Sequence, residues 1–115
     1  MAEWTEATSL RIMISDDDTY DRRPLYEAIV RAAREAKLAG VTVMRGITGY
    51  GGSGHVHETW RGFSYDLPIV VEIVDTDAKI DAWLPILGRL NAGVHVIRQR
   101  VQILKASAAG KPPAA

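Results

Sequence analysis

The sequence predicts an α+β domain whose elements follow the order strand, helix, strand, strand, helix, strand. Apolar residues alternate with period two in two segments, a third segment is apolar on both faces, and apolar residues recur with helical spacing in two others. A glycine-rich stretch separates the second strand from the third. The chain has 115 residues, of which 47% are hydrophobic, and this is enough for one domain with a modest core.

The first strand is predicted at residues 10–15, where every second residue is strongly apolar. Residues 1–9 before it are expected to form a flexible N-terminus. The acidic run 16–18 cannot continue a half-buried strand, so we expect a turn there. The first helix is predicted from Pro24, because apolar residues then recur at helical spacing, and Gly40 is expected to cap its C-terminus.

Residues 41–47 alternate again and predict the second strand. The third strand is predicted at residues 67–74, where both faces are largely apolar. Thr76 is a suitable N-cap for the second helix, in which Pro85 is expected to produce a kink or an irregular turn. The last strand is predicted at residues 94–104.

This order, with two helical connections that are long enough to be crossovers, predicts a ferredoxin-like βαββαβ domain over residues 10–104. Residues 105–115 are expected to form a disordered tail. Both helices would cover one face of an antiparallel sheet. The opposite face would expose four apolar side chains, Met44, Val70, Val74 and Val101. An exposed apolar surface of this kind is typical of an interface, so we expect a homo-oligomer.

The composition excludes several classes of function. Without cysteine, the chain has no disulfide, no thiolate metal site and no thiol nucleophile. Its 14 basic and 14 acidic side chains give a formal charge of zero, which argues against a partner made of nucleic acid. No apolar run reaches the roughly 20 residues that a transmembrane segment needs. The first nine residues do not resemble a signal peptide, so a cytoplasmic location is expected.

Three stretches resemble a known family. They are Arg23 to Tyr26 followed by the predicted helix, then GVTVMRGITGYGGSG from Gly40 to Gly54, and then DLPIVVEIVDTDAKIDAWLPIL from Asp66. In this order they are similar to the uncharacterised PII-like proteins catalogued as domain of unknown function one hundred and ninety. The resemblance extends from about Leu10 to Leu104.

The resemblance implies a ferredoxin-like subunit that assembles into a compact homotrimer. In PII signalling proteins a segment called the T-loop connects the second and third strands and contacts target proteins, while small effectors bind in clefts between subunits near its base. Here residues 46–49 would be the start of the T-loop, and Tyr50 to Tyr65 the loop itself. Signalling PII proteins carry a second loop with glycines and a lysine, but residues 91–93 have no lysine. This argues against triphosphate binding and leaves a smaller nucleotide or another anion open.

The glycines of the loop offer exposed backbone N–H groups that suit an anion. Gly49, Gly51 and Gly54 match the pattern G-x-G-x-x-G, but no helix is predicted after them, so a dinucleotide site is not expected. The alternative is a solvated loop without a fixed ligand. The predicted ligand-binding residues are Arg45, Gly46, Gly49, Tyr50, Gly51, Gly52, Ser53, Gly54, His55 and His57.

Other side chains of the loop offer further chemistry. His55 and His57, followed by Glu58, form an alternative metal site, although this set is smaller than a closed structural site requires. Trp60 and Phe63 are predicted to bind a protein partner, or to pack the loop against a neighbouring subunit.

Charged residues outside the loop provide two more candidate sites. Arg98 and Arg100 share one face of the last strand and could contact an anion at a subunit cleft, or pair with acidic neighbours. Four aspartates could bind a divalent cation, or form a solvated turn: Asp16, Asp17, Asp18 and Asp21.

The sequence therefore predicts a PII-like regulatory protein, a trimer that senses a small effector and signals through the loop between its second and third strands. The alternative is a metal-binding or metal-tolerance trimer that uses the loop histidines, and a third interpretation is a trimer that binds only protein. No serine, histidine and acid form a recognisable catalytic motif, so we do not expect an enzyme, and no cofactor is predicted. The sequence does not identify the effector or the protein target.

Overall fold

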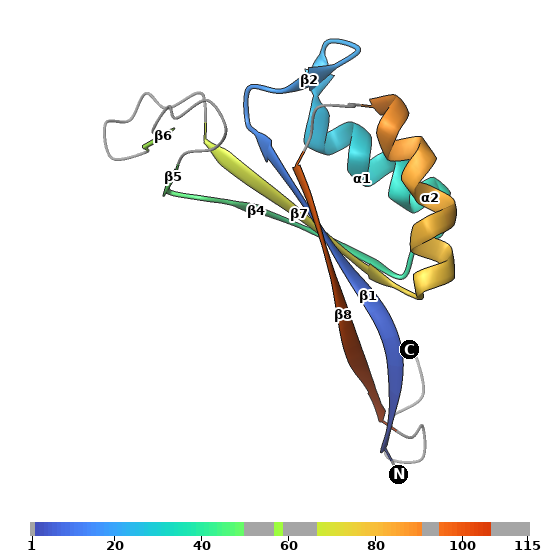
Figure 1. Cartoon of the computed structure of the whole chain (residues 1–115). Helices are drawn as coiled ribbons and strands as arrows, with labels where there is room; N and C mark the ends of the chain where they lie inside the picture. Colours follow the sequence, from blue (N-terminus) through green and yellow to red (C-terminus); the bar gives the residue numbers. More distant parts are fainter. Residues whose placement is uncertain (1, 50–56, 59–66, 91–94, 107–115) are drawn as a thin grey trace, which may run out of the picture.

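The computed structural model describes residues 2–49, 57–58, 67–90 and 95–106 (Figure 1). Its elements, in chain order, are β1 (Ala2–Ser15), β2 (Thr19–Tyr20), β3 (Arg23–Pro24), α1 (Leu25–Glu35), β4 (Gly40–Arg45), β5 (Thr48–Gly49), β6 (His57–Glu58), β7 (Pro68–Asp75), α2 (Asp77–Leu90) and β8 (His95–Ala106). Neither described helix is long and apolar enough to cross a membrane.

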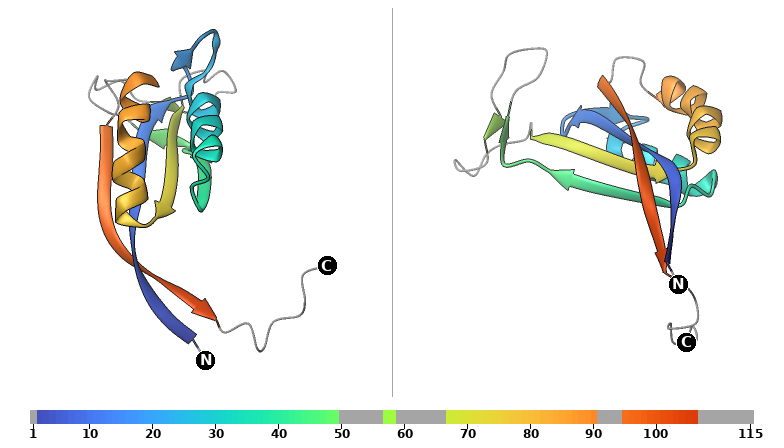
Figure 2. Two further views of the ribbon diagram at one scale, coloured as in Figure 1. Left: turned by 90° about the vertical axis from the view of Figure 1, so that its right-hand side faces the viewer. Right: turned by 60° about the horizontal axis from the view of Figure 1, so that its bottom comes forward.

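The main sheet has the strand order β4-β7-β1-β8, and every neighbouring pair is antiparallel. Both helices lie on one face of the sheet and contact each other, as the two views of Figure 2 show. The predicted ferredoxin-like α+β fold is therefore confirmed. The core lies between this face and the helices, and its fully buried large side chains are Leu10, Ile12, Leu25, Ile29, Ile69, Val71, Ile73, Ile80 and Trp83.

Strand β7 shows why the sheet has one covered face and one bare face. Its residues alternate between buried and half-buried from Pro68 to Asp75. Ile69, Val71 and Ile73 face the helices, so Val70 and Val74 point to the other side. Register then gives the rest of this bare face, whose apolar members are Met13, Met44, Val70, Val74, Ile97 and Val101. Met44 is 44% exposed, and Val70, Val74 and Val101 are half-buried, so the predicted apolar surface is confirmed.

Strands β1 and β8 extend together beyond the rest of the sheet (Figures 1 and 2). Strand β7 pairs with β1 only from Thr8 onward, whereas β8 pairs with β1 from Ala2 to Met13. We call residues 2–7 and 101–106 the arm. The prediction of a flexible segment over residues 1–9 is therefore wrong from Ala2 on, because β8 supplies the backbone partners of this segment. Of the predicted tail, residues 105 and 106 belong to β8, and residues 107–115 lie outside the described residues.

Helix α1 ends earlier than predicted. Its last residue is Glu35, and the left-handed backbone that terminates it falls at Lys37, with φ of 59°. The N–H of Leu38 donates to the carbonyl of Ala33 (3.1 Å), and that of Lys37 donates to Arg34 (3.0 Å). This is a Schellman motif without glycine. Gly40 instead begins β4, so its predicted role as the cap is wrong.

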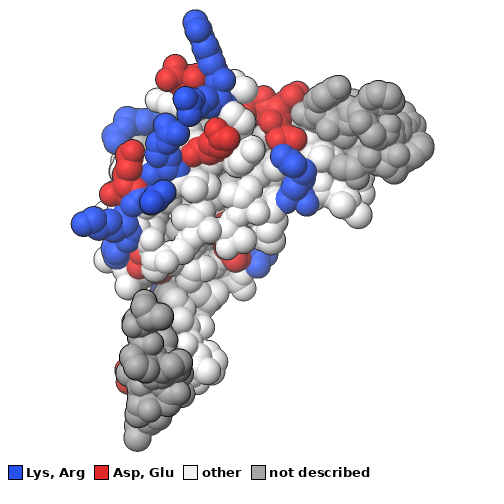
Figure 3. Space-filling model, turned by 180° about the vertical axis from the view of Figure 1, so that it is seen from behind, with Lys and Arg blue, Asp and Glu red and all other residues white. Residues whose placement is uncertain are grey.

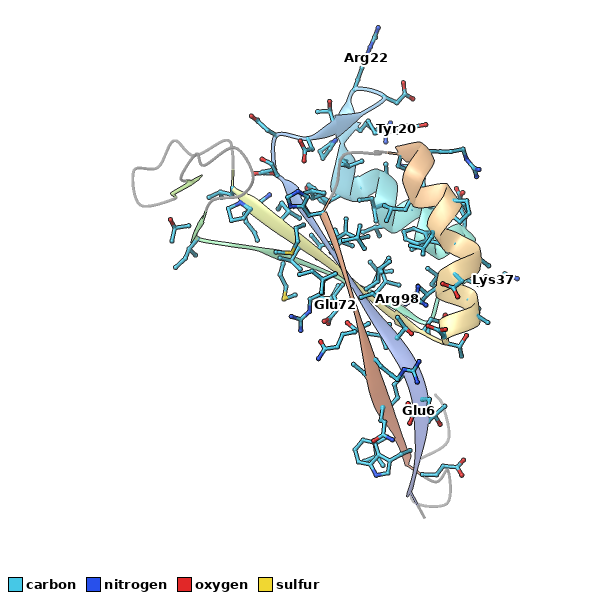
Figure 4. All side chains as sticks on the ribbon, viewed as in Figure 1. Glu6, Tyr20, Arg22, Lys37, Glu72 and Arg98 are labelled. Carbon is cyan, nitrogen blue, oxygen red and sulfur yellow. The ribbon has the colours of Figure 1, made fainter. Side chains whose placement is uncertain are left out.

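A short hairpin precedes α1 where the sequence indicated only a turn. Strands β2 and β3 pair Thr19 with Pro24 and Tyr20 with Arg23. The two residues between them, Asp21 and Arg22, have φ of 51° and 67°. Two successive positive φ values are typical of the tight turns that match the twist of a hairpin. Arg22 therefore stands at the tip of this hairpin and points away from the body (Figure 4).

Helix α2 begins as predicted. The hydroxyl of Thr76 accepts a hydrogen bond from the N–H of Lys79 (3.3 Å), which is N-cap geometry. The helix then runs as one element through Pro85 to Leu90. The predicted stop at residues 91–93 lies outside the described residues.

Candidate functional site

The base of the loop after β4 is held to the neighbouring strands by backbone hydrogen bonds. The N–H of Gly46 donates to the carbonyl of Pro68 (2.7 Å), and the N–H of Asp16 donates to that of Leu67 (2.8 Å). These bonds join the ends of β1, β4 and β7. The loop therefore leaves and re-enters the sheet at neighbouring points, and its base is rigidly connected to the core.

Gly46 is required by the close approach of Pro68. A Cβ atom at position 46 would lie 2.6 Å from Cγ of Pro68, far inside van der Waals contact. Because the proline ring has little freedom to move, glycine is the residue that fits here. At Gly49 the same Cγ would lie 3.4 Å away, at the edge of ordinary contact, so the constraint is much weaker there.

Arg45 is the cationic side chain at the loop base. Its Nη2 atom lies 3.2 Å from Oδ1 of Asp16, which follows the end of β1. Arg45 is about half exposed, so this ion pair contributes little to stability. A guanidinium carries five N–H donors in a fixed fork. The contact with Asp16 therefore orients Arg45 and leaves donors for a bound anion.

Beyond its base, the loop is described only in part. Strand β5 pairs with β6, so that Thr48 opposes Glu58 and Gly49 opposes His57. The backbone thus brings His57 next to the loop base. The side chains of His57 and Glu58 lie outside the description, and so do all atoms of the remaining predicted residues, namely Tyr50, Gly51, Gly52, Ser53, Gly54, His55, Trp60 and Phe63.

The acidic run after β1 forms a turn. The Ser15 N–H donates to Oδ2 of Asp18 (2.9 Å), and the Asp18 carbonyl accepts the N–H of Leu25 (2.7 Å). These bonds connect the end of β1 to the start of α1. Within the described part of the chain, no group of three or more His, Asp or Glu side chains is placed to hold a metal ion. The turn interpretation therefore explains these aspartates.

A second cluster of charged side chains lies at the opposite edge of the sheet, where β8 faces α2. Arg98 forms ion pairs with Asp77 and, at 2.7 Å, with Asp81 (Figure 4). The hydroxyl of Thr8 also donates to Asp77 (2.7 Å). The bonds from Arg98 and then from Thr8 hold the pKa of Asp77 below its ordinary value of 3.8. The two carboxylates in turn raise the pKa of Arg98.

Arg98 is therefore committed to the first turns of α2, and Arg100 is not. Arg100 lines a cavity of about 170 Å³ together with Glu6, Ala7, Thr8 and Asp77. Among the residues that the structure describes, it makes no hydrogen bond or ion pair. Its positive charge only helps to lower the pKa of Asp77 from a distance. Of the two arginines on this face of β8, Arg100 is the one available to an anionic ligand.

The two clusters lie at opposite edges of one sheet. Arg45 ends β4 at one edge, Arg100 lies on β8 at the other edge, and β7 and β1 run between them. A single copy of the chain does not bring these arginines together. A site that uses both requires the β4 edge of one copy next to the β8 edge of another.

The sequence did not predict that Arg98 would pair with acidic residues of α2 while Arg100 would line a cavity. It identified the two as sharing a face and left open whether they pair with acidic residues. The signal that was present is the spacing of Asp77 and Asp81, which places both carboxylates on one side of α2. Within the described residues Arg100 has no acidic partner because β8 extends past α2 at this point, and the local sequence carries no sign of this extension.

The fold is similar to that of solved PII-like proteins. CPII from Thiomonas intermedia K12, a nitrogen regulatory PII-like protein bound there to ADP, AMP and bicarbonate, matches with a TM-score of 0.66 and 15% identity, covering 88% of this chain and 91% of that chain. A PII-like signalling protein from Thermus thermophilus matches with a TM-score of 0.55 and 14% identity, covering 92% and 95%. CutA from Synechococcus elongatus PCC7942 matches with a TM-score of 0.62 and 14% identity, covering 91% of this chain and 85% of that chain. The fold is thus that of the PII-like and CutA ferredoxin-like proteins.

Sequence comparison then identifies the family. The family DUF190, described as "Uncharacterized ACR", matches residues 7–103. A UPF0166 protein of Methanocaldococcus jannaschii is 30% identical over 94 residues, which cover 80% of this chain and 87% of the relative. A UPF0166 protein of Aquifex aeolicus (strain VF5) is 39% identical over 77 residues, which cover 65% of this chain and 72% of the relative. The chain belongs to the DUF190 family, and the resemblance noted in the sequence is confirmed.

Proposed function

We propose that this protein is a PII-like regulatory subunit that binds a small anionic effector, a nucleotide or another anion, in clefts between copies of itself. The copies form a homotrimer that covers the bare face of each sheet. Effector binding changes the order or position of the loop after β4, and this change is read by a partner protein. In this proposal the protein acts by binding and has no catalytic role.

The observation that carries this proposal is the placement of Arg45 and Arg100. Each has guanidinium donors that the described contacts leave unused, and they lie at opposite edges of one sheet. Packing of neighbouring sheets around a symmetry axis brings unlike edges together. A cleft between copies would then place one cation from each subunit around the same ligand, and Arg pairs well with phosphate and carboxylate oxygens.

The loop base supplies the connection between binding and signalling. Gly46 and Arg45 lie directly where the loop leaves the sheet, and the hydrogen bonds of residues 16 and 46 fix this point to the core. A ligand that contacts Arg45 would therefore touch the loop at the point where it joins the core. In this proposal the loop responds to the ligand, since a change of order in a segment can transmit ligand binding.

ADP, AMP and bicarbonate are the first effectors to test, because CPII was solved with these molecules bound. The measurement is thermal unfolding of the purified protein with and without each ligand, followed by titration calorimetry on every ligand that raises the Tm. Divalent metal ions form a separate arm of the screen. A metal ion that raises the Tm while every nucleotide and anion fails would instead favour the metal-binding interpretation of His55, His57 and Glu58.

Arg100→Ala tests the contribution of the β8 edge, and Arg22→Ala at the hairpin tip is its charge-matched control. We expect Arg100→Ala to weaken binding of the ligand found in the screen by about 10-fold or more, because a charge-assisted hydrogen bond is lost. Arg22→Ala should bind like the parent protein. Equal affinities of the two variants would contradict a role for the β8 edge in the site.

A further inference from the structure

The arm carries an exposed apolar pair at its tip. Trp4 and Leu104 are directly paired across β1 and β8, and they are 63% and 50% exposed. Both point to the face of the sheet that the helices cover, since they are in phase with Thr8 and Leu10 along β1. Helix α2 starts at Asp77, opposite Thr8, so no described helix reaches the arm.

This geometry is costly for an isolated chain. Beyond Thr8 the arm is a two-stranded ribbon, because β7 has ended. Two-stranded ribbons are only marginally stable in water unless another element packs on them. A paired tryptophan and leucine on such a ribbon also expose a large apolar surface. The described part of this copy therefore leaves the arm uncovered, and its apolar pair is suited to contact with another surface.

A groove of matching character lies at the opposite edge of the sheet. It has a volume of about 460 Å³ and runs between α1 and β4. Tyr26, Val30 and Val43 form its apolar part, and the charged residues along it are Arg23, Glu27, Arg31 and Arg34. Figure 3 shows Lys and Arg side chains on the helical side of the molecule, with Asp and Glu side chains among them.

The groove suits a tryptophan for two reasons. Tyr26, Val30 and Val43 provide apolar contacts for its ring. The three arginines outnumber the single glutamate, and a guanidinium over the face of an indole ring is a favourable cation–π contact. Tryptophan and arginine are also the residue types that contribute most to protein interfaces.

The arm cannot reach the groove of its own chain. Val43 pairs with Val71, which pairs with Ile12, and Ile12 is eight residues from Trp4 along β1. At about 3.3 Å per residue this is a separation of roughly 26 Å along the strand alone. The arm and the groove are at opposite edges, so a contact between them joins two copies head to tail, and such a contact can close into a ring.

We propose that the arm of each subunit inserts Trp4 and Leu104 into the groove between α1 and β4 of its neighbour. The occupant of the groove is thus a second copy of this chain. The inference rests on the homo-oligomer of the proposed function, and adds a contact that joins the β8 edge of one subunit to the β4 edge of the next. This contact also brings Arg100, at the root of the arm, toward the neighbouring subunit.

Cross-linking tests the proposal cleanly because the chain contains no cysteine. The double variant Glu6→Cys with Val43→Cys keeps Trp4 and Leu104, because Glu6 is an exposed residue on the same face of β1 as Trp4. It is treated with a bismaleimide whose reach is shorter than the separation within one chain, which is still about 20 Å for the six residues from Glu6 to Ile12 along β1. We expect covalent dimers and trimers on a denaturing gel. The matched control is Thr5→Cys with Val43→Cys, since Thr5 is the exposed neighbour of Trp4 and faces the other side of the arm. This control and the single variants should yield mainly monomer.

Two outcomes would overturn the proposal. One is equal cross-linking of the Glu6→Cys/Val43→Cys and Thr5→Cys/Val43→Cys double variants. The other is a Glu6→Cys/Val43→Cys sample that elutes as an oligomer and yields no cross-linked product. Trp4→Phe and Trp4→Ala provide a second readout. The phenylalanine variant should keep the oligomer, whereas the alanine variant should dissociate at higher protein concentration than the parent; unchanged dissociation would again overturn the contact. If an effector raises the Tm but no cross-link forms, the arm contact alone is rejected. If the cross-link forms but none of the tested effectors raises the Tm, the proposed sensing role alone is rejected.

Discussion

At the scale of single residues, close contacts show where the sequence has little freedom. Gly46 meets Pro68 so closely that an added Cβ would overlap the proline ring. Lys37 shows the opposite case, since it adopts the left-handed backbone without being glycine. Two hydrogen bonds hold the backbone of Lys37 in this conformation, one from its own N–H and one from the N–H of Leu38. The side chain of Leu38 also packs against the core, which fixes the chain just after Lys37.

Replacement of Gly46 by alanine tests how closely Gly46 packs against Pro68 at the loop base. We expect the free energy of unfolding to fall by about 1–3 kcal/mol, because the new methyl group forces the strand ends apart. Gly88→Ala is the matched control, since nothing lies within 4 Å of the Cβ position at Gly88 in α2. The control should gain about 0.5–1 kcal/mol from helix propensity. Urea unfolding at one protein concentration measures both, and a Gly46→Ala variant as stable as Gly88→Ala would contradict a closely packed base.

At the scale of elements, one buried carboxylate connects three segments. Asp75 ends β7 and accepts hydrogen bonds from the N–H groups of Ala39 (2.8 Å) and Thr76 (2.6 Å), while Nζ of Lys79 lies 3.5 Å away. Burial raises the pKa of Asp75, but the two backbone N–H groups and Lys79 together lower it more, so that it ends below 3.8. The charged form of Asp75 therefore stabilises the entry to β4 and the start of α2.

This carboxylate should make stability depend on pH. Because the pKa of Asp75 is lowered in the folded state, its contribution is fully present above about pH 5 and is lost as the pH falls through the folded-state pKa. We expect Asp75→Asn to lose about 1–3 kcal/mol at pH 7, with a smaller difference from the parent protein below pH 4. The control is Asp17→Asn, at an exposed position of the turn after β1. Urea unfolding as a function of pH would refute the role of Asp75 if the difference stayed constant.

The elements also show which parts of the fold local sequence can predict. The period-two pattern around Ile12, the apolar run around Val71 and the helical pattern around Ile80 helped to predict the four main strands, both helices and their order. Local patterns succeed here because apolar residues recur at the positions that each element buries. The extension of β1 to Ala2 was missed, since its partner lies near the other end of the chain. The β2–β3 hairpin was missed because Asp21 and Arg22 stand where glycine or asparagine usually signals such a turn.

Some residues of the candidate site could be predicted from the sequence, but their contacts could not. The importance of Gly46 and Arg45 followed from the glycine-rich sequence and from the family resemblance. The contact of Arg45 with Asp16 joins residues that are 29 positions apart, and the sequence contains no pattern that links them. The groove between α1 and β4 depends on how two elements pack, so it became visible only in three dimensions.

At the scale of the whole molecule, the bare face of the sheet is the surface on which the proposed assembly depends. Its apolar side chains flank an ion pair between Arg11 and Glu72 (3.1 Å), and Glu72 also accepts a hydrogen bond from Ser9. A surface with apolar side chains around a small polar network is suited to association. In the proposed homo-oligomer, the bare face and the arm would provide two separate contacts between subunits.

A charge placed on the bare face should break the assembly. We expect Val70→Glu to convert the oligomer into monomer, because association would bury an unpaired carboxylate. Ala82→Glu, at an exposed position of α2, adds the same charge away from this face and should leave the assembly intact. Size-exclusion chromatography with light scattering distinguishes the two. An oligomer of unchanged mass for Val70→Glu would show that the bare face is not the interface.

The central position of β1 has a consequence for how the chain folds. This first strand pairs only with β7 and β8 in the main sheet, and Thr8, for example, is opposite Arg100. Contacts between residues so distant in sequence form slowly, because a long loop must close before they gain any energy. During synthesis β1 therefore leaves the ribosome long before its partners exist. Strand β1 has to remain unpaired at least until β7 (Pro68–Asp75) has been made, and this is the period in which it is most exposed to aggregation and to chaperones.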